Sequence, residues 1–469
     1  MPPSESNDPT LIIRNPATDE IVGTVPAQGP TEAKAAIAAA VVAQRDWRAR
    51  SANGRCRPLR RMGELMLRDE ERLARILTLE QGKPLSEARG EIRYAASFLE
   101  WAAEEGRRLN GETIPGNRRN QRILVFRQPI GVTAAITPWN FPSAMITRKL
   151  GPALATGCAM VVKPAEQTPL SALALRELAD EAQIPADVFR IVTGEPEAIG
   201  DAFLSNPAVR MLSFTGSTEV GKLLMRKAAE NVTRLGLELG GHAPFLVFDD
   251  ADLEKAVSAA IACKFRNAGQ TCISANRFLV QDGIYERFAD ALAARVSDLR
   301  VGSGLEEGVH IGPLIDDAAV AKVERHLDDA LSGGATVRTG GQKLPMEEGF
   351  ADRFFAPTVL DGITGQMQLS HEETFGPIAP LRRFVHEDEA LEIANDTPYG
   401  LAAYFFTRDA SRLMRMAEGL DYGIVGANDG GPSTAQAPFG GMKQSGIGRE
   451  GGHHGMDEYV EIKYVSWQI

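Results

Sequence analysis

Hydrophobic and polar positions change their spacing repeatedly along this chain, from the period of a helix to that of a strand. Alanine-rich apolar positions at helical spacing follow a Pro30-Thr31 start and predict a helix over residues 32–50. The apolar runs 134–137 and 159–163, bounded by glycine and proline, predict short buried strands. Because helices and strands alternate throughout, the pattern favours the α/β class.

Two further apolar segments have the character of exposed strands. Residues 123–126 form a short apolar run between two arginines, and residues 460–464 alternate apolar positions with Glu461 and Lys463. We predict edge or assembly strands here, since unpaired strand edges are liabilities unless something covers them. A homodimer or a dimer of dimers is therefore expected.

Length and charge limit the class of protein. The 469 residues are about three times a typical domain of roughly 150 residues, so two or three structural units are expected. No apolar run approaches the roughly 20 residues of a membrane span, and residues 1–8 are polar, which predicts a cytoplasmic protein without a membrane segment. The net charge of -11 argues against nucleic acid as a partner.

The four cysteines are Cys56, Cys158, Cys263 and Cys272. They are too few and too irregularly spaced for a disulfide framework or a zinc site, so no metal is expected. Residues 252–265 repeat apolar positions at helical spacing, with Cys263 on the apolar face, and we expect Gly269 to break this helix. Cys272 then falls on a loop, where backbone dipoles can favour its thiolate for attack on a carbonyl.

Five short motifs occur in a specific order along the chain. They are Pro138-Trp139-Asn140, Phe214-Thr215-Gly216-Ser217-Thr218, Glu238-Leu239-Gly240-Gly241, Gly269-Gln270-Thr271-Cys272 and Glu373-Thr374-Phe375-Gly376-Pro377. Together they closely resemble the aldehyde dehydrogenase superfamily, and related motifs run from Asn15-Pro16 to Arg449-Glu450. The resemblance implies that family's fold, with a Rossmann-type cofactor domain, an α/β catalytic domain and a small antiparallel oligomerisation region.

The resemblance also implies a division of catalytic work. Cys272 corresponds to the nucleophile, and the Asn140 amide with the Cys272 backbone N–H would hold the oxyanion of a thiohemiacetal. Glu238 is the candidate general base for hydrolysis of the thioester that remains after hydride transfer. Lys149 and Glu450 match positions that the family uses for proton handling.

Cofactor binding departs from the usual dinucleotide fingerprint, because no Gly-x-Gly-x-x-Gly follows a strand. By resemblance, Gly216 and Ser217 at a helix start meet the pyrophosphate. The other cofactor positions implied are Trp139, Lys163, Glu166, Glu373 and Phe375. A carboxylate at Glu166 would bond ribose hydroxyls and repel a 2′-phosphate, so NAD is expected over NADP.

The substrate class depends on the residues around the thiol. Arg148, Arg266 and Ser433 match succinate-semialdehyde dehydrogenases, in which two guanidinium groups and a hydroxyl would clamp the distal carboxylate of an ω-oxo acid. Glutarate semialdehyde and 2-oxoglutarate semialdehyde remain alternatives, because a hydrophobic tunnel discriminates one methylene by only roughly 1–3 kcal/mol. The position two residues beyond the nucleophile is Ser274, so no local disulfide is expected.

Three regions are expected from the family pattern. Residues 1–111 and 132–237 would form the NAD-binding domain, residues 238–430 the catalytic domain, and residues 112–131 with 431–469 the oligomerisation region and C-terminal segment. Two other classes stay open: a cysteine esterase or thioesterase without a redox step, and a non-catalytic structural relative. The pyridine-nucleotide motifs argue against the first, and the intact Cys272, Asn140 and Glu238 against the second.

Overall fold

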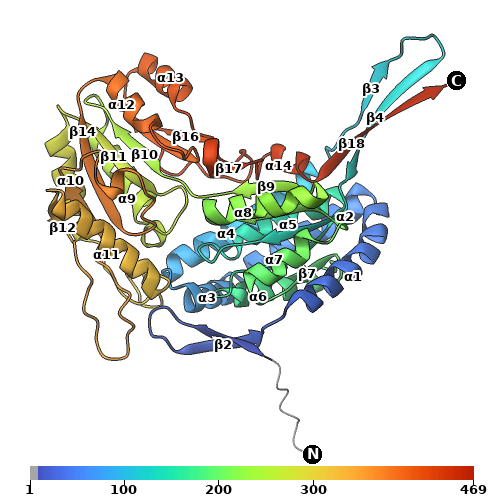
Figure 1. Ribbon diagram of the computed structural model, residues 1–469, viewed down its shortest axis with the longest axis horizontal. Coiled ribbons are helices and arrows are strands. Elements are labelled where there is room, and N and C mark those ends of the chain that lie inside the picture. Colours follow the sequence, from blue (N-terminus) through green and yellow to red (C-terminus); the bar gives the residue numbers. More distant parts are fainter. Residues whose placement is uncertain (1–8) are drawn as a thin grey trace, which may run out of the picture.

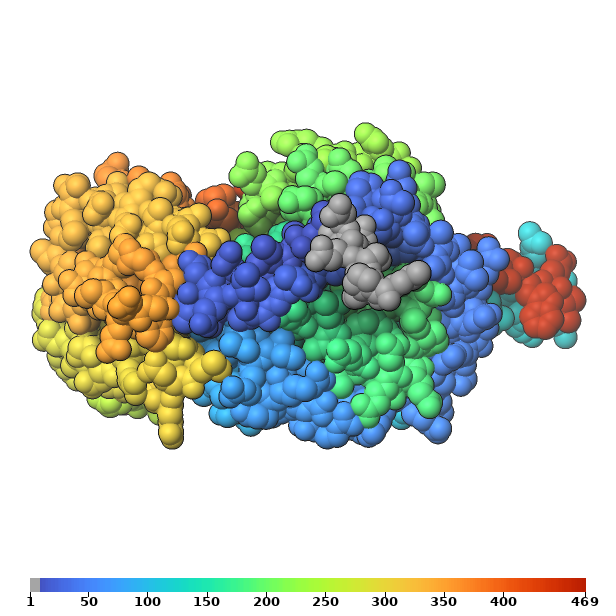
Figure 2. All heavy atoms as spheres, turned by 90° about the horizontal axis from the view of Figure 1, so that it is seen from below, coloured from blue at the N-terminus to red at the C-terminus, as the bar shows by residue number. Residues whose placement is uncertain are grey.

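The computed structural model describes residues 9–469, which form two lobes side by side and an arm that projects from one of them (Figure 1). Figure 2 shows the same division from below, with the arm standing clear of the body. The expectation drawn from residues 1–8 lies outside the described residues. No helix within 9–469 is long and apolar enough to cross a membrane.

The first lobe is built on a six-stranded sheet in the order β17-β9-β8-β5-β6-β7. All its strands are parallel except β17, which pairs antiparallel with β9. Every residue of β5 and β6 is buried, which confirms the two buried strands predicted from their apolar runs. The strands are β5 (Val132–Ile136), β6 (Ala159–Lys163), β7 (Phe189–Ile191), β8 (Val209–Thr215), β9 (Arg234–Glu238) and β17 (Gly446–Ile447).

Helices pack around this sheet, and a hairpin of β1 (Thr10–Arg14) and β2 (Ile21–Pro26) lies beside them. The predicted first helix is confirmed, with Pro30 at its first turn and the Glu32 carboxylate accepting from the Gly29 amide. The helices are α1 (Pro30–Ala49), α2 (Ala52–Arg68), α3 (Glu70–Gln81), α4 (Leu85–Glu105), α5 (Ala144–Thr156), α6 (Pro169–Glu181), α7 (Pro196–Leu204), α8 (Thr218–Ala228) and the 3-10 turn η1 (Ala229–Asn231).

The second lobe contains a seven-stranded sheet in the order β12-β13-β14-β11-β10-β15-β16, parallel except for β12. Alternate residues of β10 face opposite sides, so that Phe245 and Val247 pack in one core while Leu246 packs in another, together with Phe248 just beyond the strand. The strands are β10 (Ala243–Val247), β11 (Ala275–Gln281), β12 (Thr336–Thr339), β13 (Thr358–Asp361), β14 (Ile378–Phe384), β15 (Ala402–Phe406) and β16 (Ile424–Ala427).

Helices cover both faces of the second sheet. The first core contains residues of α9 (Leu253–Lys264), α10 (Tyr285–Ser297) and α11 (Asp317–Ser332), and the second contains residues of α12 (Glu387–Asn395) and α13 (Ala410–Gly419). Short elements complete the chain: η2 (Arg266–Gly269), η3 (Gln368–Ser370), η4 (Lys443–Ser445) and α14 (His454–Asp457).

The arm is a three-stranded antiparallel sheet in the order β18-β4-β3, formed by β3 (Glu112–Pro115), β4 (Gln121–Pro129) and β18 (Val460–Gln468). Both strand predictions are confirmed, although the first strand is longer than its apolar run and lies in the centre of the arm instead of at its edge. The edge strand β18 exposes large apolar side chains, including Ile462, which is 72% exposed.

The strands of the two sheets meet at the junction with opposite ends, carboxyl ends in the first sheet and amino ends in the second. The carboxyl ends of β5 and β8 in the first sheet lead into the segments that contain Asn140 and Ser217, and Glu238 is the last residue of β9. The amino ends of β11 and β14 in the second sheet follow the segments that contain Cys272 and Glu373. The fold therefore gathers residues that lie far apart in sequence at the junction of the lobes.

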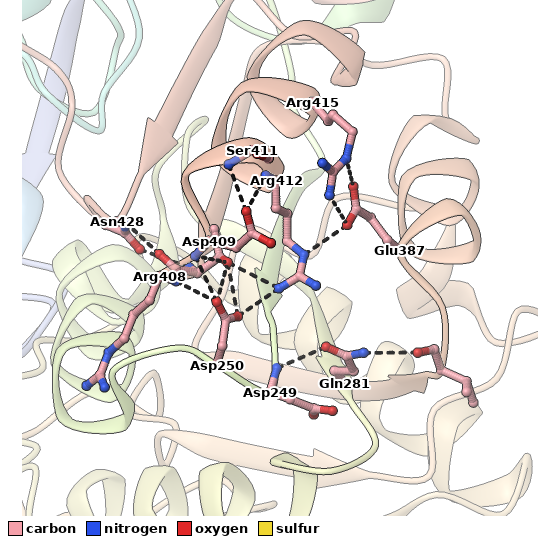
Figure 3. A network of polar contacts seen from close by, with 12 residues as sticks. Asp249, Asp250, Gln281, Glu387, Arg408, Asp409, Ser411, Arg412, Arg415 and Asn428 are labelled. Carbon is pink, nitrogen blue, oxygen red and sulfur yellow. Dashed lines mark hydrogen bonds and ion pairs between the residues drawn. The ribbon is translucent and has the colours of Figure 1, made fainter.

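At the carboxyl ends of β10 and β15 in the second sheet, a polar network connects α12 and α13 to the strands (Figure 3). Asp250, beyond β10, accepts hydrogen bonds from the Thr407 hydroxyl, which follows β15, and from the Arg412 guanidinium of α13. Arg412 also donates to Glu387 at 2.9 Å, and Arg415 binds the same carboxylate at 2.7 Å. This cluster connects α12 and α13 to the segments that follow β10 and β15.

Replacing Glu387 by Gln should destabilise the protein in a pH-dependent way. Hydrogen bonding from Arg415, and then from Arg412, lowers the pKa of Glu387 to about 2. A lowered pKa means that the carboxylate stabilises the fold fully above about pH 4.5 and loses this effect as the pH falls towards 2. The free energies of unfolding that urea titrations give for the two proteins should differ at pH 7 by roughly 1 kcal/mol or less, and by less at pH 3.5.

Glu348→Gln, at an exposed glutamate that makes no ion pair within the described chain, is the matched control and should change the free energy of unfolding at neither pH. An equal loss at both pH values for Glu387→Gln would show that the ion pairs do not account for its contribution.

Candidate active site

Cys272 lies on a loop between α9 and β11, as predicted, but the loop begins earlier than expected. Helix α9 ends at Lys264, and three successive residues, Asn267, Ala268 and Gly269, have positive φ of 52°, 55° and 76°. Only the last of them is glycine, and a Cβ there would lie 2.2 Å from the Gly376 carbonyl oxygen. The helix is therefore ended by a whole left-handed turn and not by Gly269 alone.

Buried hydrogen bonds hold this left-handed turn. The Asn267 amide N–H donates to Glu87 Oε2 at 2.8 Å, and Gln81 Nε2 donates to Asn267 Oδ1 at 3.0 Å. Gln270 Nε2 donates back to the Asn267 carbonyl at 3.1 Å, while its Oε1 accepts from the Ile315 amide at 2.9 Å. Such bonds offset the cost of about 1–3 kcal/mol for each residue held in a disfavoured conformation.

The Cys272 thiol is half-buried and borders two cavities. Burial, and next the Glu373 carboxylate, raise its pKa to about 12. This differs from the activation expected of a loop cysteine, because desolvation outweighs the positive charges of Arg148 and Arg266. The thiol is therefore protonated in the resting protein and needs a base. Cys263, by contrast, is buried in the core, as predicted.

Asn140 is held against the Cys272 loop. Its Nδ2 donates to the Gln270 carbonyl at 3.0 Å, and because an amide nitrogen carries two hydrogens, the second remains for another acceptor. Within residues 9–469 the Cys272 backbone N–H has no hydrogen-bond partner. Two unused donors therefore lie beside the thiol.

Glu238 belongs to a buried cluster of charges. Burial, and then the neighbouring Glu450, raise the pKa of Glu238 well above its usual value, and its Oε2 has no hydrogen-bond partner in the described chain. Burial would also raise the pKa of Glu450, but Lys149 and Arg148 outweigh that effect and lower it. Lys149 binds both Glu450 and the Thr215 hydroxyl. The two carboxylates predicted from the sequence, Glu238 and Glu450, therefore have pKa values shifted in opposite directions.

One cavity, of about 370 Å³, brings together most of the predicted cofactor residues with the thiol. Trp139 and Phe375 lie edge to face with ring centres 5.6 Å apart, and Phe375 has a positive φ of 56°. Glu373 accepts from the Gly241 amide, and burial raises its pKa to about 7. The cavity wall includes Trp139, Asn140, Gly216, Ser217, Glu238, Cys272, Glu373 and Phe375.

The chemistry of this cavity fits a dinucleotide. Ser217 begins α8 and its hydroxyl accepts from the Val220 amide, so the positive end of an 11-residue helix faces the cavity. The carboxylate of Glu373 can accept from ribose hydroxyls, while the two aromatic rings provide a flat apolar wall.

Lys163 and Glu166 lie outside that cavity. They form an ion pair beyond the end of β6, and Lys163 is almost fully buried, which lowers its pKa to about 8. Glu166 is half-buried. They lie at the carboxyl end of β6, next to the end of β5 that leads to Trp139. A dinucleotide that extends from the cavity could place its adenosine end there.

The second cavity, of about 280 Å³, contains all three predicted substrate residues and Cys272. Arg266 is exposed, makes no ion pair in residues 9–469 and lies 5.2 Å from the Phe141 ring centre. Arg148 is buried, stacks 3.9 Å from the Phe439 ring centre, and has its Nε 2.9 Å from Glu450 Oε2 without hydrogen-bond alignment. Its Nη2 atom has no hydrogen-bond partner in the described chain.

Sequence reasoning missed several residues of this cavity. Glu87, Glu91 and Tyr94 lie on one face of α4, and the Tyr94 hydroxyl hydrogen-bonds to Ser433. Their spacing of four and then three residues is that of one helical face and could have suggested a common surface. Phe141 and Phe439, which complete the aromatic wall, each adjoin a motif.

No group of three or more histidine, cysteine, aspartate or glutamate residues within 9–469 is arranged to hold a metal ion. The polar groups at the two cavities are instead amides, hydroxyls, carboxylates, guanidinium groups, the Lys322 ammonium and the Cys272 thiol.

Similar proteins identify the family. Residues 4–465 match the aldehyde dehydrogenase family model. The chain is 57% identical over 460 residues to the succinate-semialdehyde dehydrogenase [NADP(+)] GabD of Escherichia coli (strain K12), covering 98% of this chain and 95% of that protein. It is 56% identical over 459 residues to a glutarate-semialdehyde dehydrogenase of Pseudomonas putida, covering 98% and 94%.

A solved structure agrees with these sequence matches. The succinate-semialdehyde dehydrogenase from Burkholderia pseudomallei superposes with a TM-score of 0.96 at 56% identity, covering 98% of this chain and 95% of that one. Since the family model spans nearly the whole chain and the fold matches throughout, the chain belongs to the aldehyde dehydrogenase family and acts as a nicotinamide-dinucleotide-dependent enzyme on an aldehyde.

Proposed function

We propose that this enzyme oxidises an ω-oxo acid, succinate semialdehyde in the first place, to the dicarboxylate with NAD. The observation that carries the proposal is the position of Cys272 in the common wall of two cavities. One cavity suits a dinucleotide and the other presents two guanidinium groups. A thiol at their junction can reach an aldehyde from one side while a hydride leaves on the other.

Cys272 and Asn140 carry the first step. Glu238 or a water molecule takes the thiol proton, and the sulfur attacks the aldehyde carbon. The oxyanion that forms accepts from the free Asn140 hydrogen and from the Cys272 N–H, both unspent in the resting site. NAD held in the cavity beside Ser217, Glu373 and Phe375 would supply the hydride acceptor for the oxidation that leaves an acyl group on the sulfur.

Glu238 carries the second step, hydrolysis of the thioester. Its deprotonated form removes a proton from the attacking water, and its raised pKa makes it a stronger base than an exposed carboxylate. Lys149 donates to Glu450 and to the Thr215 hydroxyl, and the charges of Lys149 and Glu450 act on Glu238, so these groups give a buried polar path near the base. Protons leave the site along this path.

The distal carboxylate of the substrate binds in the second cavity. Arg266 offers an unpaired guanidinium at its rim, Arg148 offers a buried NH2 group, and the linked hydroxyls of Ser433 and Tyr94 lie nearby. Relatives at 57% and 56% identity are named for succinate semialdehyde and glutarate semialdehyde. Glutarate semialdehyde is therefore the first alternative substrate, followed by 2-oxoglutarate semialdehyde.

NAD is the proposed cofactor, because the Glu166 carboxylate would bond the adenine ribose and repel a 2′-phosphate. The Escherichia coli relative is named for NADP(+), so a preference for NAD would distinguish this enzyme from that relative. Lys163 is already paired with Glu166, which leaves less positive charge for a phosphate.

The assembly proposal is a homodimer or a dimer of dimers, because β18 leaves an apolar edge strand exposed. We assign the NAD-binding domain to residues 1–111 and 132–237, the catalytic domain to 238–430, and the assembly region to 112–131 and 431–469. Within the last range only β18 belongs to the arm, while β17 joins the first sheet. A cytoplasmic location remains a proposal.

The two chemical steps should separate in single-residue variants. Cys272→Ala should form no NADH from succinate semialdehyde, whereas Glu238→Gln should give one NADH per active site and then stall. In the unmodified protein, thioester hydrolysis should rise with pH through the raised pKa of Glu238, because only the carboxylate acts as a base. Stopped-flow absorbance of NADH measures both phases, and steady turnover by Cys272→Ala would refute the mechanism.

Charge at Glu166 should set the cofactor preference. Glu166→Ser removes the repulsion towards a 2′-phosphate and should raise kcat/KM for NADP relative to NAD. Glu348→Ser, at an exposed glutamate that makes no ion pair within the described chain, controls for a general change of net charge. An unmodified enzyme that already prefers NADP would contradict the role of Glu166.

Loss of Arg266 should affect only substrates with a distal carboxylate. A hydrogen bond to a charged group contributes roughly 1.5–3 kcal/mol, so Arg266→Gln should lower kcat/KM for succinate semialdehyde about 10- to 150-fold. The same variant should oxidise butanal, which lacks the carboxylate, with a nearly unchanged kcat/KM. Arg287→Gln, on the surface of α10, is the control and should leave kcat/KM for both aldehydes nearly unchanged. Equal losses for both aldehydes would exclude the carboxylate clamp.

A further inference from the structure

The proposed reaction has no use for two buried charges, Lys83 in the segment that joins α3 to α4 and Glu91 in α4. Lys83 and Glu91 form an ion pair at 2.7 Å, and both side chains are fully buried. Neither takes part in the chemistry described above. A buried ion pair is often no more stabilising than apolar residues of the same size, so stability alone does not account for it.

Lys83 makes its second strong contact with the segment that contains Asn140. Its Nζ donates to the Asn140 carbonyl at 2.7 Å and lies 3.8 Å from the centre of the Phe141 ring. Glu91 completes the attachment, since its Oε1 accepts from the Ser143 amide at 2.9 Å and the Ala144 amide at 3.2 Å. The pair thus fixes the backbone on both sides of Phe141.

The same carbonyl oxygen is also tied to the nucleophile loop. Asn267 Nδ2 donates to the Asn140 carbonyl at 3.1 Å, and Glu87 Oε2 accepts from the Asn267 amide. The Lys83 amide donates to Gln81 Oε1, whose side chain donates in turn to Asn267. The end of α3, Lys83 and the first turn of α4 therefore contact both the residue of the oxyanion donor and the turn that presents the thiol.

We propose that Lys83 is a positioning residue that sets the Asn140 amide against the Cys272 loop by holding the Asn140 carbonyl. Two donors on one carbonyl fix the orientation of the peptide between Asn140 and Phe141, and this restricts the position from which the Asn140 side chain starts. This inference rests on the proposed oxyanion role of Asn140. A displacement of about 1 Å at such a donor costs on the order of 100-fold in rate.

The test compares two reactions of the same thiol. With p-nitrophenyl acetate the sulfur adds to a carbonyl, an oxyanion forms, and p-nitrophenolate leaves, so the rate depends on Asn140. With iodoacetamide the sulfur displaces iodide at a saturated carbon, and no oxyanion forms. Neither probe needs the aldehyde or the dinucleotide, so failure of the proposed substrate or cofactor does not affect the result.

The variants are Lys83→Met, and Lys83→Met combined with Glu91→Gln, which removes the charge left unpaired and keeps the acceptor for Ser143 and Ala144. Acylation of Cys272 should fall about 10- to 100-fold in each folded variant, whereas alkylation should stay within about twofold. Glu80→Gln is the matched control, because this buried carboxylate accepts from the Leu170 and Ser171 amides and touches neither loop. In Glu80→Gln, the rates of acylation and alkylation of Cys272 should both be unchanged.

A double-mutant cycle with Asn140→Ala decides whether Lys83 acts through Asn140. If it does, Lys83→Met should cause no further loss of acylation once the amide is gone. The same fractional loss with and without Asn140 would overturn the proposal, as would a parallel fall in alkylation. Circular dichroism identifies unfolded variants, and the double variant is used if Lys83→Met alone does not fold.

Discussion

The active site depends on a backbone constraint, the left-handed turn from Asn267 to Gly269. This turn ends α9 and brings Cys272 to the amino edge of the second sheet, where the carboxyl edge of the first sheet supplies Asn140 and Glu238. The turn is disfavoured for two of its three residues, so it requires support from outside. That support comes from α3 and α4 in the other lobe, which couples the geometry of the nucleophile to the docking of the lobes.

Buried charge at the junction is arranged for reactivity more than for stability. Glu238 and Glu450 lie in one cluster, yet burial raises the pKa of the first, and two cations lower that of the second. The resting thiol is also kept protonated, with a pKa of about 12. A protonated thiol beside a basic carboxylate resists unwanted oxidation and alkylation, because the thiolate is the reactive form.

The α/β class, the first helix, the two buried strands, the two arm strands and the family could be predicted from the sequence, because these depend on local periodicity and short motifs. The sequence did not predict that Tyr94 would meet Ser433 or that Lys83 would reach Asn140, since these contacts join residues 339 and 57 positions apart. It also assigned thiolate character to Cys272, which the burial of the thiol reverses in the resting site. Both failures arise from tertiary packing, which creates contacts and desolvation that no single segment encodes.

The central claim is that the aldehyde becomes an acyl group on Cys272, and trapping that group tests it most directly. The enzyme is mixed with succinate semialdehyde and NAD, quenched in acid within one turnover, digested and examined by mass spectrometry. We predict a succinyl thioester on the peptide that contains Cys272, present only when aldehyde and dinucleotide are both added. A succinyl group on another cysteine, or substrate turnover without any acyl-enzyme in the Glu238→Gln protein, would contradict the account.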